Sequence, residues 1–375
     1  MVMGPRERST CRAVFAAALA ALAVLLSGSA RAEPMIAGYD PDSGAFLGTA
    51  DGAWLLNPYA MVQLTHATTF ERGDVAASSF RLHSAKMIFH GHVVSPKISY
   101  HFQTNFGEGK AVAEDLYLRA DPDPRFGVLV GQNEVPFNRQ HITLEAYQEL
   151  IDRSTVDQRF TLQRDIGVIA YAAADAAHRL EATAGVFNGA RQNAPNDDRT
   201  FMTTLRLAYN PWGPIAFREA DLDDTEHPKL SLAFAAAYNP RRIVPPDAAS
   251  SPPPHDVTHE ETLQGVAEVT LRWRGVSMTG ETHARRERVA AALRKDAGTF
   301  FQVGVFAVPR HVQVVVRDAF IAGDLWPTDV AGEQTLGVSW YVHGHRFKLQ
   351  ADGSRLQLRS GPDSWRVRAQ LEFFL

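Results

Sequence analysis

Apolar and polar residues alternate along much of the chain. Between residues 97 and 106 the polar side chains fall at odd positions and the apolar ones mostly at even positions, and residues 263–273 and 365–375 show a similar period of two. This period predicts β-strands with one apolar and one polar face. By itself it fits a soluble sandwich with an apolar core, and it also fits a membrane barrel with an apolar outer wall.

The lengths of the joins between strands favour the barrel. Joins after the second, fourth, sixth, tenth, twelfth and fourteenth of sixteen predicted strands are short, whereas joins 134–163, 189–199, 240–260 and 287–298, after odd-numbered strands, are long. Bacterial transmembrane barrels have an even number of antiparallel strands, short periplasmic turns and long outer loops. The predicted fold class is all-β, a 16-stranded antiparallel transmembrane β-barrel. We expect its strands near 55–70, 79–94, 97–107, 113–121, 125–133, 164–173, 178–188, 200–210, 229–239, 261–273, 275–286, 299–308, 311–321, 333–342, 346–357 and 364–375.

Two joins have a distinctive composition. Segment 211–228 is long where a short turn is expected and carries four acidic residues between Asp221 and Glu226, for which the sequence offers no physical reason. Segment 240–260 is rich in proline, and strand-like alternation continues on both sides of it. We interpret this second segment as a mobile outer loop rather than as a linker between domains.

The N-terminal residues have the features of an export signal. Arginines at positions 6, 8 and 12 precede an uncharged apolar run at 14–26, and Ala30 and Ala32 have the spacing of a signal-peptidase site. The run is too short for a spanning helix, which needs about 20 apolar residues. We therefore predict a signal peptide at 1–32, a short lead-in at 33–54 and one barrel domain at 55–375.

Composition excludes several classes of protein. Cys11 is the only cysteine and lies in the predicted signal peptide, so a small disulfide-stapled secreted domain is excluded. The signal peptide contains four of the 38 Lys and Arg residues and one of the 42 Asp and Glu residues, which leaves a net charge of −7 on the mature chain. This charge argues against non-specific binding of nucleic acid.

Four short strings resemble a known family of porins. They are Val130-Gly131-Gln132 followed by Val135-Pro136-Phe137, then Asp152-Arg153-Ser154, Arg164-Asp165-Ile166-Gly167-Val168 and Gly185-Val186-Phe187-Asn188-Gly189. Their order and spacing resemble the phosphate-selective porin O and P family, most densely over residues 79–190. The resemblance implies a sixteen-stranded, trimeric outer-membrane porin, some members of which select anions through inward arginines and lysines.

The chain departs from this family at the positions that bear on selectivity. Many members carry an arginine cluster on the second strand, where this chain has His83-Ser84-Ala85-Lys86. The family often has a lysine in the Gly-Gln-x-x-Val-Pro-Phe string, where this chain has Glu134. Both departures weaken the expectation of tight phosphate binding.

Loop 134–163 follows the fifth strand, where a porin's third outer loop folds inward and narrows the pore. It carries charges of both signs, and charges that face one another across a constriction select solutes by sign and size. We expect Arg164 and Asp165 to anchor the loop to the wall through a charge-assisted pair. The alternative for any single basic residue is a solvated wall that binds nothing. The candidates for pore lining and constriction are Lys86, Lys97, His101, Arg119, Glu134, Arg139, Arg153, Arg159, Arg164 and Asp165.

Catalytic and metal-binding patterns are weak. The sequence has no Gly-x-Ser-x-Gly, His-Glu-x-x-His or Gly-rich phosphate loop, and we therefore expect no enzyme and no cofactor. Four histidines at positions 83, 90, 92 and 101 lie close in sequence, but a zinc site needs three or four converging ligands. Histidines that simply face the lumen are the simpler explanation, and we predict no metal site.

These observations predict a passive diffusion channel in the bacterial outer membrane for small hydrophilic solutes or ions. The family resemblance adds an anion or phosphate preference and a homotrimer as expectations, with membrane lipid as the surrounding partner and no nucleic acid. The alternative is a barrel closed by its own loops that has a structural or adhesive role. A soluble periplasmic sandwich is a third option.

Overall fold

The computed structural model describes residues 33–40, 44–196, 198–243, 258–289, 292–323 and 330–375. Sixteen antiparallel strands, β3 to β18, pair each with the next along the chain, and β18 pairs back with β3 to close the barrel. The predicted signal peptide at 1–32 and most of the predicted loop at 240–260 lie outside the described residues. In the described part, no helix has the length and apolar character needed to cross a membrane.

The barrel strands occur in the chain order that the alternation predicts. The barrel strands are β3 (Leu55–Glu71), β4 (Asp74–Val93), β5 (Ser95–Asn105), β6 (Val112–Asp123), β7 (Phe126–Glu134), β8 (Arg164–Ala173), β9 (Leu180–Phe187), β10 (Met202–Tyr209), β11 (Lys229–Ile243), β12 (Thr258–Trp273), β13 (Val276–Val289), β14 (Ala292–Val308), β15 (Val312–Gly323), β16 (Val330–His345), β17 (Phe347–Leu358) and β18 (Ser364–Phe374). The prediction of sixteen barrel strands is confirmed.

Side-chain exposure is inverted relative to a soluble protein. The apolar face of each strand points outward, so Leu64 is 45% exposed while its polar neighbour Thr65 is 2% exposed. The same contrast separates Leu336 from Thr335 on β16. An apolar outer wall around a polar interior is the pattern of a transmembrane barrel, which excludes the soluble sandwich.

The two rims of the barrel differ in the length of their connections. On one rim β12 and β13 are joined by Arg274 and Gly275 alone, whose φ angles of 49° and 74° form a tight hairpin turn that matches the strand twist. On the other rim β7 and β8 are joined by the long loop 135–163. We refer to these edges as the short-turn rim and the long-loop rim.

The predicted long join at 287–298 is wrong, because β13 continues to Val289 and β14 begins at Ala292. Arg286 and Arg288 pair in register with Lys295 and Leu293 across this extension. Backbone hydrogen bonds between two strands form as well beside polar side chains as beside apolar ones. The loss of apolar character therefore marks the edge of the apolar band and not the end of the strand.

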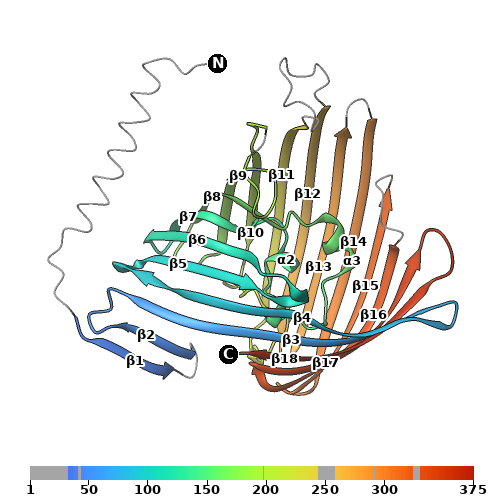
Figure 1. Cartoon of the computed structure of the whole chain (residues 1–375), viewed down its shortest axis with the longest axis horizontal. Helices are drawn as coiled ribbons and strands as arrows, with labels where there is room; N and C mark the ends of the chain where they lie inside the picture. The colour runs from blue at the N-terminus through green and yellow to red at the C-terminus, as the bar shows by residue number, and fades with distance from the viewer. Residues whose placement is uncertain (1–32, 41–43, 197, 244–257, 290–291, 324–329) are drawn as a thin grey trace.

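The lead-in at 33–54 forms a small hairpin outside the barrel. Its strands β1 (Met35–Asp40) and β2 (Gly44–Thr49) pair with each other, and β2 pairs with β3 only where Leu47 and Gly48 face Leu56 and Leu55. The hairpin therefore extends the sheet without taking part in closure, and Figure 1 shows it beside the first barrel strand. The Tyr39 hydroxyl accepts a hydrogen bond from Arg346, in the turn between β16 and β17, at 2.7 Å.

Candidate functional site

Loop 135–163 folds into the barrel, as predicted for the third loop. It contains the short helices α2 (Arg139–Ile142) and α3 (Thr155–Phe160) and the single turn η2 (Glu145–Tyr147), while the turn η1 (Gly107–Gly109) belongs to another join. Figure 1 shows α2 and α3 within the ring of strands. The Ser154 hydroxyl caps α3 by accepting a hydrogen bond from the Asp157 amide at 3.0 Å. The ring of Phe160 packs with Phe300 in a buried apolar cluster.

Carboxylates of the barrel wall hold the backbone of this loop. The amide of Arg139 donates to Glu268 on β12 at 2.9 Å, and the amide of Gln140 donates to Glu281 on β13 at 2.7 Å. At the other end, the amide of Thr155 donates to Glu333 on β16 at 2.8 Å. Hydrogen bonds to charged acceptors are shorter and stronger than neutral ones. Hydrogen bonds from loop amides to carboxylates of the wall strands therefore hold the loop in its inward position.

Glycines on the inner face of the wall make room for loop side chains. A Cβ atom on Gly298 would lie 2.6 Å from the ring of Phe160, and one on Gly337 would overlap the side chain of Leu150. A Cβ atom on Gly304 would lie 2.6 Å from the carboxylate of Glu149. Glycine within a strand often marks the close approach of another group. The sequence does contain this signal, as glycines at inward positions of predicted strands.

The acidic join 210–228 also enters the lumen, from the short-turn rim. The amide of Glu219 donates to the Tyr147 carbonyl at 3.0 Å, and its carboxylate accepts from the Glu149 amide at 2.9 Å. Asp221 accepts a hydrogen bond from the Gly275 amide at 2.9 Å, which ties the segment to the β12–β13 turn. The long join that the sequence could not explain is therefore a second inward segment that packs against the first.

Glu149 and Glu219 meet where these two inward segments touch. One amide group, the side-chain nitrogen of Gln302 on β14, donates to both carboxylates, at 2.9 and 3.0 Å. Ser277 and Gln313 also donate to Glu149. Burial and the nearby charge of Glu219 raise the pKa of Glu149 to about 7. This carboxyl group therefore changes its charge near neutral pH.

A second cluster of charges lies where the loop faces strands β4 to β8. The Lys86 ammonium lies 2.7 Å from Glu114 and 2.6 Å from Glu145 of the loop. Arg164 binds two further carboxylates, those of Asp115 and Glu134, each at 2.9 Å. Arg153 of the loop approaches Glu145 at 3.6 Å. We call these seven side chains the constriction cluster: Lys86, Glu114, Asp115, Glu134, Glu145, Arg153 and Arg164.

The constriction cluster holds three basic and four acidic groups, so its formal charge is −1. Burial by itself would raise the pKa of Glu145, but the charges of Lys86 and Arg153 outweigh it and hold that pKa well below its usual value. Glu145 is therefore ionised at neutral pH. The basic groups of the constriction cluster are therefore paired with carboxylates and do not form a ring of free cations.

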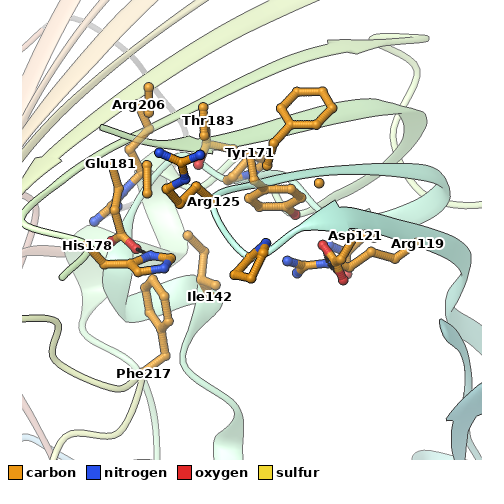
Figure 2. A pocket seen from close by; sticks show the side chains of 18 of the residues that line it. Arg119, Asp121, Arg125, Ile142, Tyr171, His178, Glu181, Thr183, Arg206 and Phe217 are labelled. Atoms are coloured by element: carbon orange, nitrogen blue, oxygen red, sulfur yellow. Dashed lines mark hydrogen bonds and ion pairs between the residues drawn. The ribbon is translucent and has the colours of Figure 1, made fainter. Parts of the chain in front are cut away.

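Beside this cluster lies a cavity of about 270 Å³, enclosed by the loop, strands β6 to β10 and segment 210–228. Figure 2 shows Arg119 and Asp121 on one side of it and Arg206, His178 and Phe217 on the other. The guanidinium of Arg119 lies 4.7 Å above the ring of Tyr171 and pairs with Asp121 at 2.9 Å. The cavity thus combines aromatic faces with charges that already have partners.

The structure brings four of the ten predicted site residues into the constriction cluster, namely Lys86, Glu134, Arg153 and Arg164. His101 and Arg119 lie on the same wall nearer the short-turn rim, where His101 stacks on Tyr117 with ring centroids 5.2 Å apart. Lys97 is exposed and donates to the Pro122 carbonyl at 3.1 Å.

The remaining predicted residues lie elsewhere. The Arg139 side chain donates to the carbonyls of Ile215 and Ala216 in the inward segment 210–228, and Arg159 pairs with Asp296 on β14 of the wall at 3.1 Å. Asp165 accepts from the amides of Ile166 and Arg191 and does not pair with Arg164, whose own carboxylate partners are in the constriction cluster. Arg164, the first residue of β8, binds carboxylates on β6 and β7, so it links wall strands at the end of the loop, and the expected Arg164–Asp165 pair does not form.

Sequence reasoning missed the acidic wall partners that hold the loop, Glu268, Glu281 and Glu333, and the Glu149–Glu219 contact. Among the described residues, no group of three or more His, Cys, Asp or Glu side chains has an arrangement that could hold a metal ion. Of the four neighbouring histidines, His90 and His101 contact each other, with ring centroids 6.0 Å apart.

Comparison with known proteins supports the family resemblance over part of the chain. Residues 63–211 match the family model described as phosphate-selective porin O and P. This region runs from within β3 to just past β10, and it includes the inward loop and all seven residues of the constriction cluster. No curated protein matches the chain by sequence.

Three solved structures share the fold with this chain at low sequence identity. The anion-selective porin from Comamonas acidovorans superposes with a TM-score of 0.59 at 10% identity, covering 86% of this chain and 100% of that one. The outer membrane channel DcaP of Acinetobacter baumannii gives 0.58 at 10% identity, with coverage of 88% and 99%. The trimer form of OmpT of Vibrio cholerae gives 0.54 at 8% identity, with coverage of 86% and 100%. At such identities the likeness establishes the porin fold.

Proposed function

We propose that this protein is a passive diffusion channel of the bacterial outer membrane for small hydrophilic solutes, exported by the signal peptide at 1–32. The observation that carries the proposal is the inward loop 135–163, which narrows a polar lumen and meets the wall at the constriction cluster. Solute moves down its gradient, and the protein supplies only width, field and exclusion. The family match and the porin fold support the same class of function.

We further infer that any anion or phosphate preference is weak. Lys86, the cation that remains where relatives carry an arginine cluster, is held between two carboxylates. Arg119 and Arg164 are paired as well. A transverse field made of paired charges orients polar solutes, but it does not concentrate one sign of ion strongly.

A homotrimer is proposed on the strength of the family resemblance and of the trimeric OmpT structure. Chemical cross-linking of purified protein in detergent, followed by mass measurement, tests this directly. A monomeric mass at all protein concentrations would contradict it.

The channel itself is tested in planar lipid bilayers. Purified protein should give discrete current steps in 1 M KCl, and a salt gradient should give a reversal potential near zero if ion preference is weak. Phosphate added at millimolar concentration should leave the chloride current largely unchanged.

The competing function, a barrel closed by its own segments with a structural or adhesive role, is favoured by one observation. Segment 210–228 enters the lumen from the rim opposite to loop 135–163 and packs against it. Protein that inserts into the bilayer, as judged by its heat-shifted mobility on a denaturing gel, but gives no current steps would support this function.

A further inference from the structure

Two cations face outward near the long-loop rim of the barrel. Arg286 on β13 and Lys295 on β14 lie directly opposite each other in register and are both exposed. Across the described ranges of the chain, neither one forms an ion pair with a carboxylate, and the outward-facing Glu261 pairs instead with Arg288, at 3.6 Å. Two adjacent cations without a carboxylate partner leave a positive site on the outer wall.

An apolar groove of about 450 Å³ adjoins these cations on strands β11 to β14. Its floor is low because Ala236, Gly265 and Ala284 face one another in register on neighbouring strands. The outward side chains of Phe234 and Leu263, 56% and 49% exposed, rise beside it. The groove therefore offers apolar contact along its length and positive charge at one end.

The height of the groove on the wall fits the edge of the apolar layer. Trp273 ends β12 at the short-turn rim and faces outward, as interfacial aromatic residues of barrels do. Leu263 lies ten residues before Trp273 on the same strand, towards the long-loop rim, and is opposite Arg286. Ten residues rise ~33 Å along a strand, or ~23 Å across the membrane at ~45° tilt, close to the ~25 Å apolar band. The two cations thus lie at the level of headgroup phosphates of the opposite leaflet.

We propose that this groove binds an anionic lipid of the surrounding membrane. An acyl chain lies along Phe234, Gly265 and Leu263, and a headgroup phosphate lies between Arg286 and Lys295. Arginine and lysine form strong charge-assisted hydrogen bonds with phosphate oxygens, and a single apolar chain matches the narrow floor. The inference depends on the membrane location of the barrel but not on conduction, so a closed barrel would leave it intact.

Native mass spectrometry of the purified full chain in micelles tests the site. The probes are dioleoylphosphatidylglycerol and dioleoylphosphatidylcholine, which have the same acyl chains, at equal concentration. Wild type should retain the anionic lipid preferentially, and the double variant Arg286→Ala/Lys295→Ala should reduce that preference about tenfold, because hydrogen bonds to charged groups are individually strong.

A groove-filling variant separates the acyl contact from the charge. A Cβ atom on Gly265 would have its closest contact, 3.4 Å, with the Ala235 carbonyl oxygen, so Gly265→Phe fits the backbone and fills the floor. It should reduce retention of both lipids while both cations remain. The matched control Arg274→Ala/Arg310→Ala removes two exposed arginines at the short-turn rim and should change nothing. Heat-shifted gel mobility verifies that each variant is a folded barrel.

Three results would overturn the proposal. One is equal retention of the two lipids by wild type. Another is displacement of the bound lipid by 10 mM inorganic phosphate, which would indicate a free-anion site. The third is a double variant that changes the oligomeric mass with lipid retention unchanged, since a second copy of the chain would then be the occupant of the groove.

Discussion

Replacement of Lys86 by glutamine changes both the charge and the geometry of the constriction cluster. The Lys86 ammonium binds Glu114 on the wall and Glu145 on the loop, so Lys86→Gln takes the formal charge of the cluster from −1 to −2 and weakens one link between loop and wall. We expect a channel that conducts more current and prefers cations more strongly. Glu145→Gln weakens the same link but takes the charge to zero.

The size of the selectivity change follows from Coulomb's law. One unit charge acting on an ion at ~10 Å through water contributes ~0.4 kcal/mol, which is a factor of ~2 in local ion concentration. In Lys86→Gln the local concentration of cations rises by this factor and that of anions falls by it, so the cation-to-anion permeability ratio should rise about fourfold. In Glu145→Gln both changes are reversed, and the ratio should fall about fourfold. Both effects should shrink at high salt, since the screening length is ~10 Å at 0.1 M and ~3 Å at 1 M.

Reversal potentials in planar bilayers under a KCl gradient near 0.1 M measure this ratio, and single-channel steps measure conductance. The matched control is Lys97→Gln, which removes the same charge from an exposed side chain at the short-turn rim. The two cluster variants should move the reversal potential in opposite directions and conductance in the same direction. A larger shift in Lys97→Gln than in Lys86→Gln, or shifts of equal sign in Lys86→Gln and Glu145→Gln, would refute the assigned constriction.

Three further predictions concern the seating of the inward loop. Gly298→Leu should displace the Phe160 ring of the loop from the wall and increase the single-channel conductance in bilayer recordings. An unchanged conductance would contradict the proposal that the packing of Phe160 against Gly298 holds the loop inward. Arg317→Ala should lower the free energy of unfolding in urea by about 3–5 kcal/mol, because it leaves a buried carboxylate unpaired; a loss below 1 kcal/mol would count against this. Burial and the charge of Glu219 raise the pKa of Glu149 from 4.5 to about 7, so its stabilising effect is complete below pH 4.5 and is lost as pH rises through 7. The melting temperature should therefore fall from pH 5 to pH 8, and Glu149→Gln should flatten that dependence.

The order of the barrel strands could be read from the sequence because alternation is a local property. Residues two apart share a face, so the alternation within residues 365–375 predicts which side chains face outward without reference to any other strand. The limits of the strands were harder to predict. Pairing continues beyond the apolar band wherever both partners supply backbone hydrogen bonds, which is why β13 and β14 extend through the predicted join at 287–298.

The candidate site was predicted only in part. The inward loop followed from its length and its position after the fifth strand, and the family resemblance pointed to the same region. Partner choice did not follow, because Lys86 and Glu145 are separated by 59 positions and Glu149 and Gln302 by 153. Which charges neutralise one another depends on where the loop lies across the lumen.

By itself, the sequence determined the period, the number and the order of the strands, together with the side of each that faces outward. Only the tertiary structure decided that segment 210–228 turns inward, that wall carboxylates hold the loop amides, and that Lys86 and Arg164 are paired with carboxylates. The reason is physical. Strand faces arise from backbone geometry between neighbouring residues, whereas the charge balance of the lumen arises from side chains that meet only when the barrel closes.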